Sequence, residues 1–228
     1  MLIKTKGIVV SFIKFRETSI ICKIYTETLG LQSYIVNGVR KHGKKSLMAL
    51  YQPLSVLDMV VYHKSNQSLH RISELKSGYP FQSIFINPIK ISIGLFITEM
   101  VSKTIKEGES HEDIYTFLKH SILELDCMKE GFENFHLAFL IQFAQYLGFT
   151  ITSSTDILLV RNNYGKYQTN EQAIAILDLL IQNGYSENVQ IKNIDRRMAL
   201  DLLINFYKYH FETMGDINSI KVLQELNQ

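Results

Sequence analysis

Residues 7–37 read GIVVSFIKFRETSIICKIYTETLGLQSYIVN, and this stretch decides the fold of the first part of the chain. Three runs in it, 7–13, 19–26 and 31–37, are short, rich in β-branched and aromatic residues, and partly alternating, which is typical of β-strands. The segment ETLG at 27–30 predicts a hairpin turn between the second and third runs. The stretch therefore predicts three consecutive strands.

Two further strands follow a short interruption. The run LMALYQPL at 47–54 contains a proline that breaks regular structure. The runs 56–63 and 69–76 predict a fourth and a fifth strand, joined by a hairpin at SNQS. Five short strands, with an irregular or helical piece after the third, are typical of a small closed barrel. We expect an OB-fold, the commonest such barrel that binds single-stranded nucleic acid.

The period of the apolar residues changes from about residue 84 onward, where it becomes helical. Helices are predicted over 86–108, 111–128, 132–149, 171–184, 195–211 and 218–227. The third of them is apolar almost all round, so we expect it to be central and buried. The segment ILLVRNNYGKYQ at 157–168 is interpreted as a small β-hairpin that turns at Asn163–Gly165.

These patterns predict an α+β multidomain protein. A five-stranded OB-fold barrel occupies residues 1–80, and an all-α helical domain with the small β-hairpin insert occupies residues 81–228. The boundary near 80–86 is placed by the change of period around Gly78, Pro80 and Pro88.

The composition indicates a globular protein of the cytoplasm. Apolar residues make up 46% of the 228 residues, enough for a sizeable core. Cys22 and Cys127 are far apart and no CxxC pair exists, which argues against a disulfide framework and fits a reducing compartment. We find no run long enough to span a membrane and no signal peptide. We therefore expect a cytoplasmic, nucleoid-associated protein without a membrane partner.

Charge is divided unequally along the chain. Residues 1–80 hold twelve of the 24 basic residues but four of the 22 acids, a net +8. The remainder holds twelve basic and eighteen acidic residues, a net −6. Because unpaired charges are too costly to bury, the cations of so small a barrel must lie on its surface. Such a surface attracts a polyanion, and we interpret it as a nucleic-acid interface.

The stretch NGVRKHGKKS at 37–46 is one residue short of a phosphate-binding P-loop. Lys45 stands where that motif needs a magnesium-binding hydroxyl, and Pro53 interrupts the segment that should continue as a helix. We interpret the stretch as a basic loop of the barrel, with a nucleotide-binding hydrolase using Gly38–Lys45 and a solvated turn as alternatives. The predicted DNA-binding residues are Arg40, Lys41, Lys44 and Lys45 in the loop, and Lys14, Arg16, Lys23, Lys64 and Arg71 elsewhere in the barrel. Candidates for stacking on bases, each of which also fits the core, are Phe12, Phe15, Tyr25 and Tyr34.

These residues resemble a known family, the bacterial recombination mediator RecO. The segments KTKGIVVSFIKFRETSIICKIYTETLG, NGVRK and LYQPLSVLDMVVY are similar to the N-terminal domain of that family, and FHLAFLIQFAQYLGF and the C-terminal tail are similar to its helical part. The matching positions are Gly7, Ile8, Glu17, Thr26, Gly30, Gly38, Arg40, Lys41, Gln52 and Pro53.

The resemblance implies a protein that is not an enzyme. It implies binding of single- and double-stranded DNA, annealing of complementary strands, and loading of RecA onto DNA coated with single-stranded-DNA-binding protein (SSB), together with RecR. It also implies binding of the acidic C-terminal tail of SSB, which needs an apolar pocket rimmed by cations. Our candidates for that pocket are Arg196, Arg197, Lys192 and Lys208, although pairing of the arginines with Asp195 or Asp201 is an alternative.

The chain departs from the family in one place. Many members carry a four-cysteine zinc module after the Y-L-G-F segment, whereas GFTITSSTD follows here without cysteine. We therefore predict no zinc module, no metal and no other cofactor. His63 and His70 would face each other across the second hairpin, but exposed hairpin histidines usually hold no metal.

No catalytic constellation is recognisable in the sequence. The acidic run EGESHED at 107–113 fits a solvated loop between helices. Three functions stay open from the residues: a DNA-binding mediator, a nucleotide hydrolase, and a protein adaptor that does not bind DNA.

Overall fold

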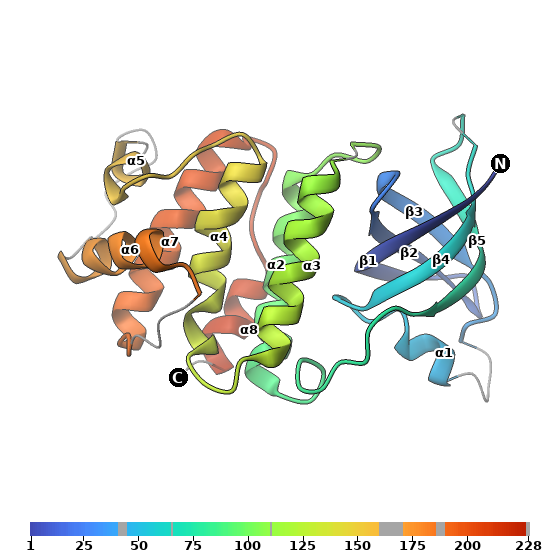
Figure 1. Ribbon diagram of the computed structural model, residues 1–228, viewed down its shortest axis with the longest axis horizontal. Helices are drawn as coiled ribbons and strands as arrows, with labels where there is room; N and C mark the ends of the chain where they lie inside the picture. The colour runs from blue at the N-terminus through green and yellow to red at the C-terminus, as the bar shows by residue number, and fades with distance from the viewer. Residues whose placement is uncertain (41–44, 65, 110, 160–170, 186–189, 227–228) are drawn as a thin grey trace. The chain divides into compact units, whose positions relative to one another are not determined.

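The structure is a computed structural model that describes residues 1–228 except 41–44, 65, 110, 160–170, 186–189 and 227–228 (Figure 1). The strands are β1 (Leu2–Phe15), β2 (Ser19–Thr26), β3 (Gly30–Val36), β4 (Val56–Tyr62) and β5 (Leu69–Ser77). The helices are α1 (Lys45–Ala49), α2 (Pro88–Thr104), α3 (Glu112–Cys127), the 3₁₀ turn η1 (Phe132–Asn134), α4 (Phe135–Tyr146), α5 (Ser154–Leu159), α6 (Glu171–Asn183), α7 (Asn193–His210) and α8 (Ser219–Leu226). None of the helices in the described ranges has the length and apolar character needed to cross a membrane.

The five strands close into a barrel in the order β1-β2-β3-β5-β4. All neighbouring pairs are antiparallel except β3 and β5, which run parallel. Helix α1 lies between β3 and β4 in the chain. This strand order is the Greek-key arrangement of an OB-fold, so the predicted five-stranded barrel is confirmed. Figure 1 shows the strands in blue to teal, wrapped around a common interior.

Alternation along β2 shows how the sequence fills the barrel. Ile20, Cys22 and Ile24 point inward and are fully buried, and Tyr34 and Leu57 from other strands complete the same core. The residues between them point outward, because successive side chains of a strand lie on opposite faces.

The turn between β2 and β3 depends on two residues. The Thr26 hydroxyl donates to the Gly30 carbonyl at 2.9 Å and accepts from the backbone N–H of Leu29 at 3.0 Å. Gly30 has a φ of 65°, a conformation that glycine adopts without the steric cost of a side chain. The predicted hairpin at 27–30 is confirmed, and its geometry accounts for a threonine and a glycine four positions apart.

Helix α4 is the buried centre of the helical part, as its apolar sequence predicts. Nine of its twelve residues are buried, and it packs against α6 and α7. Tyr207 of α7 donates a hydrogen bond to the Leu140 carbonyl at 2.7 Å inside this core. The sequence prediction is wrong at Ile157–Leu159, which belong to helix α5 rather than to a β-hairpin. The remainder of that segment, including the turn at Asn163–Gly165, lies outside the described residues.

The chain forms two compact units. The first comprises Met1–Gln82 and Thr98–Leu123, and the second comprises Ser83–Ile97 and Glu124–Gln228. These units follow contacts in space, whereas the predicted domains 1–80 and 81–228 follow the change of sequence period. The predicted division stays a prediction.

Candidate nucleic-acid interface

Three predicted cations lie together at the turn between β1 and β2. Arg40 joins this turn twice, because its backbone N–H donates to the Thr18 carbonyl at 3.0 Å and its Nη1 donates to the Arg16 carbonyl at 3.3 Å. Arg16 has a φ of 52° and places its guanidinium 5.2 Å from the centre of the Phe15 ring. Lys14, at the end of β1, is exposed beside them. We call Lys14, Arg16 and Arg40 the turn cluster.

Most of the basic loop itself is not described by the structure. Lys41 and Lys44 lie outside the described residues, and only the backbone of Lys45 is described, at the start of α1. The surroundings do not favour a P-loop, because β3 belongs to a closed barrel and α1 has only five residues. A P-loop instead joins a strand to a longer helix whose N-terminus faces the phosphates.

A second pair of predicted cations lies at the hairpin between β4 and β5. Lys64 and Arg71 are exposed, and in the described part of the chain neither is paired with a carboxylate. Arg71 lies opposite Tyr62 in β4 and opposite Ile35 in β3. The loop that joins β4 and β5 is one of the two through which OB-folds contact oligonucleotides; the other joins β1 and β2.

Lys23, by contrast, is already paired. Its ammonium lies 3.0 Å from Oε1 of Glu107, and the same oxygen accepts a hydrogen bond from Ser33 Oγ at 3.0 Å. Burial alone raises the pKa of Glu107, but the hydrogen bonds from Lys23 and Ser33 and the charge of Lys23 outweigh it, so the pKa is lowered. Glu107 is therefore ionised at neutral pH and neutralises Lys23.

The segment around Glu107 is exposed, and its backbone is also bonded to the barrel. Glu107 forms an isolated parallel bridge with Leu31, and the backbone N–H of Gly108 donates to the Leu31 carbonyl at 3.0 Å. The backbone N–H of His111 also donates a hydrogen bond to the Tyr25 hydroxyl at 3.3 Å. The predicted solvated loop is therefore confirmed for 107–109, which are exposed between α2 and α3, although these contacts hold the loop to the barrel. We call residues 105–109 the acidic cover, since they lie over the outward face of β2 and β3.

Two of the four aromatic residues proposed for base stacking are not available for it. Tyr25 and Tyr34 are fully buried, and Phe12 packs partly against the barrel core. Sequence reasoning missed Tyr62, the last residue of β4, whose side chain is 51% exposed. The alternation of β4 carries the missing signal, because Val61 points into the core and its neighbour must therefore point outward.

His63 and His70 do meet across the hairpin, with ring centres 4.5 Å apart. His70 is buried rather than exposed, and the Nδ1 atoms of both rings have no hydrogen-bond partner within the described residues. Burial and the neighbouring His63 lower the pKa of His70. No third metal-binding side chain joins this pair in the described part of the chain, so we do not assign a metal to it.

In the second unit, Arg196 is held by three oxygen atoms. Its Nε donates to Asn134 Oδ1 at 2.8 Å, its Nη1 to Asn193 Oδ1 at 2.6 Å, and its Nη2 to the Ile191 carbonyl at 3.0 Å. These acceptors are neutral, so they orient the guanidinium without cancelling its charge. Burial lowers the pKa of Arg196, and Glu133 opposes that shift.

Arg197 lies beside Arg196 at a small cavity of about 10 Å³. Its Nη2 donates to the Gln224 carbonyl at 3.1 Å, at an exposed position. The cavity is lined by His136, Asn193, Arg196, Arg197, Leu200, Leu223 and Gln224. It therefore combines two arginines with apolar side chains, although its volume suits a single water molecule.

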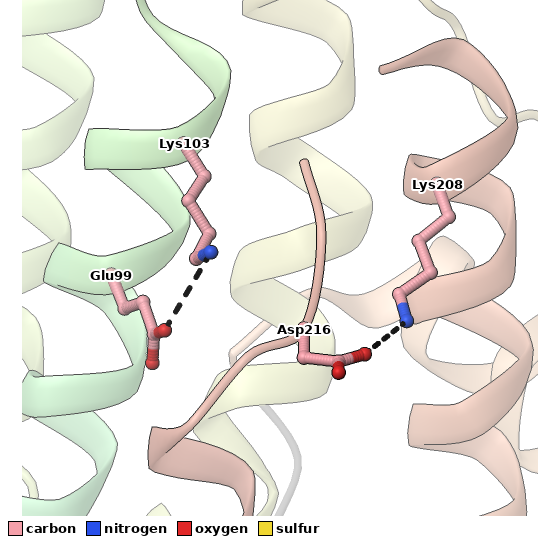
Figure 2. Close-up of polar contacts among 4 residues, drawn as sticks. All are labelled: Glu99, Lys103, Lys208 and Asp216. Atoms are coloured by element: carbon pink, nitrogen blue, oxygen red, sulfur yellow. Dashed lines mark hydrogen bonds and ion pairs between the residues drawn. The ribbon is translucent and has the colours of Figure 1, made fainter. Parts of the chain in front are cut away.

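The two remaining predicted cations lie elsewhere. Lys192 lines a separate, open groove of about 570 Å³ with Ile176, Leu179 and Ile191. Lys208 forms an ion pair with Asp216 (Figure 2), and its Nζ lies 3.3 Å from Oδ1 of that residue. The structure therefore brings together Arg196 and Arg197 but not all four of the predicted residues.

Comparisons with known proteins point to one family along the chain. The family model "Recombination protein O N terminal" matches residues 1–81, and "Recombination protein O C terminal" matches residues 87–158. Proteins named DNA repair protein RecO are 34% identical in Flavobacterium psychrophilum, 32% in Flavobacterium johnsoniae and 31% in Bacteroides fragilis. Each of these alignments covers 99% of this chain and 99% of the relative.

Proposed function

The chain belongs to the recombination protein O (RecO) family, and from that premise we propose that it is a DNA-binding mediator of recombination in DNA repair. In this role the protein binds and rearranges DNA strands in the cytoplasm and does not catalyse a reaction. The ligands are single- and double-stranded DNA.

The observation that supports DNA binding most directly is the set of exposed cations on the barrel. The turn cluster and the pair Lys64 and Arg71 mark the two loops through which OB-folds contact oligonucleotides. Residues 1–80 carry only four acids, so their field is positive. Neutralising phosphates with such cations releases counterions, which supplies binding that does not depend on base sequence.

Strand annealing follows from the same charge. Two complementary strands repel each other through their phosphates, and a cationic surface that screens both lets base pairing proceed. Loading of RecA onto SSB-coated DNA, with RecR as partner, belongs to the proposal through the family resemblance.

For the acidic tail of SSB we propose the surface around Arg196 and Arg197. The helical part of the chain has a net negative charge, so an acidic peptide needs a local cationic site to overcome it. Arg196 is oriented by neutral acceptors and Arg197 is exposed next to it. Leu200 and Leu223 form the apolar wall of the cavity, and both are buried. A peptide must lie across the mouth of the cavity, because the cavity itself holds about one water molecule.

The hydrolase and adaptor alternatives make different predictions. A hydrolase must bind ATP in a way that Lys44→Ala abolishes, and a five-residue helix after the basic loop does not support such a site. An adaptor must show no salt-dependent DNA binding. Both alternatives are tested by measurements on the same purified protein.

The decisive experiment is a salt titration of single-stranded DNA binding. Replacing Arg40, Lys41, Lys44 and Lys45 together by Ala should flatten the log–log salt slope by roughly 2 to 3, since each lost phosphate contact removes about 0.7. Lys129→Ala and Lys221→Ala, in the helical part, serve as controls and should leave the slope unchanged. An unchanged slope in the fourfold variant removes the basic loop from the interface, and absence of DNA binding in the wild type overturns the proposed function.

A further inference from the structure

A single row of residues runs across all five strands of the barrel on its outer surface. Ile13 of β1 pairs with Ile21 of β2, which pairs with Ile35 of β3. Ile35 pairs with Arg71 of β5, and Arg71 pairs with Tyr62 of β4. Residues that are paired directly across strands point to the same face of a sheet. We call these five residues the outer row.

Burial shows that the outer row faces solvent. Ile13 is 62% exposed and Tyr62 is 51% exposed, Arg71 is exposed, and Ile21 and Ile35 are partly exposed. The adjacent residues on the same strands point inward and form the core, among them Cys22 and Tyr34. Four of the five strands thus place an apolar side chain in the row, and β5 places Arg71 there. Apolar side chains that neighbour one another on a surface often mark a binding surface.

The acidic cover leaves this row open. Glu107 lies on the neighbouring pair Lys23 and Ser33, one step along β2 and β3 from Ile21 and Ile35. Because the ion pair is neutral, Lys23 is not available to phosphates on this part of the β2–β3 face. Among the described residues, Lys64 and Arg71 have no such carboxylate partner, so the cations available to a polyanion lie beside the outer row.

Cations border the row at both ends. Lys14 follows Ile13 in β1, and Arg16 lies beyond it in the turn, which also contains Glu17. Arg40, which follows β3 in the chain, is hydrogen-bonded to this turn. Arg71 is a member of the row, and Lys64 lies two residues beyond Tyr62. An apolar strip with an aromatic ring, bordered by cations, fits a ligand that has flat apolar groups along a charged backbone.

We propose that the outer row is the nucleobase-binding face of the barrel for single-stranded DNA. Tyr62 stacks on a base, and Arg71, whose Cβ lies about 5 Å away across the strand pair, contacts an adjacent phosphate. The isoleucines give the following bases an apolar surface that does not depend on their sequence. The inference rests on the proposed DNA binding and specifies where the bases lie. Duplex DNA cannot use Tyr62 in this way, because its bases are stacked on each other.

The test compares Tyr62→Ala, Tyr62→Phe and Arg71→Ala for binding to an unstructured oligothymidine and to a duplex. Tyr62→Ala should weaken oligothymidine binding about 5- to 100-fold with an unchanged salt slope, as expected for loss of one stacked base. Tyr62→Phe keeps the ring and should bind like the wild type. Arg71→Ala should flatten the slope by about 0.7. Tyr209→Ala, at a comparably exposed tyrosine of α7, is the matched control and should change neither the affinity for oligothymidine nor the salt slope.

The outcomes separate this inference from the proposed function. If oligothymidine binds with a normal salt slope and Tyr62→Ala binds equally well, the outer row is not the base-binding face although DNA binding stands. An equal loss of affinity for the duplex and for oligothymidine in Tyr62→Ala also overturns the inference. So does a Tyr62→Ala variant that binds DNA like the wild type but no longer binds a protein partner. Should Tyr62→Ala fail to fold, photocrosslinking of iodouracil-substituted single strands to the wild type decides: attachment at Tyr62 supports the inference, and attachment only elsewhere refutes it.

Discussion

Glu107 neutralises Lys23 through an ion pair of 3.0 Å while it accepts a hydrogen bond from Ser33. One carboxylate from outside the barrel therefore cancels a cation on the strand face that OB-folds commonly use for oligonucleotides. Because the acidic cover is also joined to Leu31 through its backbone, removing the charge of Glu107 need not remove the cover.

Glu107→Gln should strengthen binding of single-stranded DNA and steepen its salt slope by about 0.7, because Lys23 gains the freedom to contact a phosphate. Glutamine keeps an oxygen to accept from Ser33, so the fold should be preserved. The measurement is a salt titration with oligothymidine. Glu109→Gln removes the same charge from the same cover without an ion pair to Lys23, and equal effects of the two variants would show that only net charge matters.

Lys90 is a fully buried lysine that serves as a structural centre of the second unit. Its side chain is 1% exposed, and its Nζ donates to Ser83 Oγ at 2.7 Å and to the carbonyls of Asp126 at 3.1 Å and Met128 at 2.5 Å. The Asp126 carboxylate accepts in turn from the backbone N–H groups of Ser83 and Ile84, each at 2.8 Å. Burial lowers the pKa of Lys90, and the charge of Asp126 opposes that shift.

Lys90→Met should lower the free energy of unfolding by about 2 to 4 kcal/mol, because three buried acceptors and the Asp126 charge lose their partner. Urea unfolding of the full-length protein measures this loss. The control is Lys103→Met, since Lys103 forms a helical pair with Glu99 at 4.0 Å (Figure 2), and such a pair contributes only a few tenths of a kcal/mol. Similar losses for the two variants would contradict a special role of Lys90.

The course of the strands was predictable from sequence because each carries its own signal. The alternation in β2 and the turn at Thr26–Gly30 are local features of the sequence. The five strands and their order along the chain could therefore be predicted from the sequence. β1 begins at Leu2, whereas the prediction placed its start at residue 7. Ile3 and Thr5 continue the alternation toward the N-terminus, but the exposed Lys4 and Lys6 between them obscured it.

The candidate site was less predictable because it depends on contacts between distant segments. The ion pair of Lys23 joins β2 to a residue more than eighty positions away, and no local pattern marks it. The exposure of Tyr62 and the burial of Tyr34 depend on which face of each strand turns inward. The cations, in contrast, could be assigned to the surface from the cost of burying charge alone.

Arg197→Ala should weaken binding of an acidic peptide with a terminal aromatic residue by about 10- to 150-fold, as charge-assisted hydrogen bonds of about 1.5 to 3 kcal/mol imply. Among the described residues, the Arg197 side chain donates one hydrogen bond, to the Gln224 carbonyl at the surface, so the fold should tolerate its loss. Fluorescence anisotropy of a labelled peptide is the measurement. Lys208→Ala is the control because Asp216 already pairs with Lys208, and a larger loss there than at Arg197 would place the peptide elsewhere.

His136 predicts how the second unit responds to acid. It is fully buried in α4, its Nδ1 has no hydrogen-bond partner within the described residues, and its ring meets Phe96 edge to face. Burial and the charge of Arg196 lower the pKa of His136 from 6.5 to about 3. The unfolded chain therefore binds a proton at His136 below pH 6.5, whereas the folded chain does not bind it until about pH 3.

It follows that the stabilising contribution of a neutral His136 is complete above pH 6.5 and is lost as the pH falls toward 3. His136→Leu removes this titration, so its free energy of unfolding should depend less on pH than that of the wild type, by on the order of 1 kcal/mol per pH unit between pH 6 and 4. Urea midpoints at several pH values provide the measurement. His120→Leu, at an exposed position, should keep the wild-type dependence. If His136→Leu also keeps it, then His136 is protonated in the folded protein and the buried ring must have a partner for its charge.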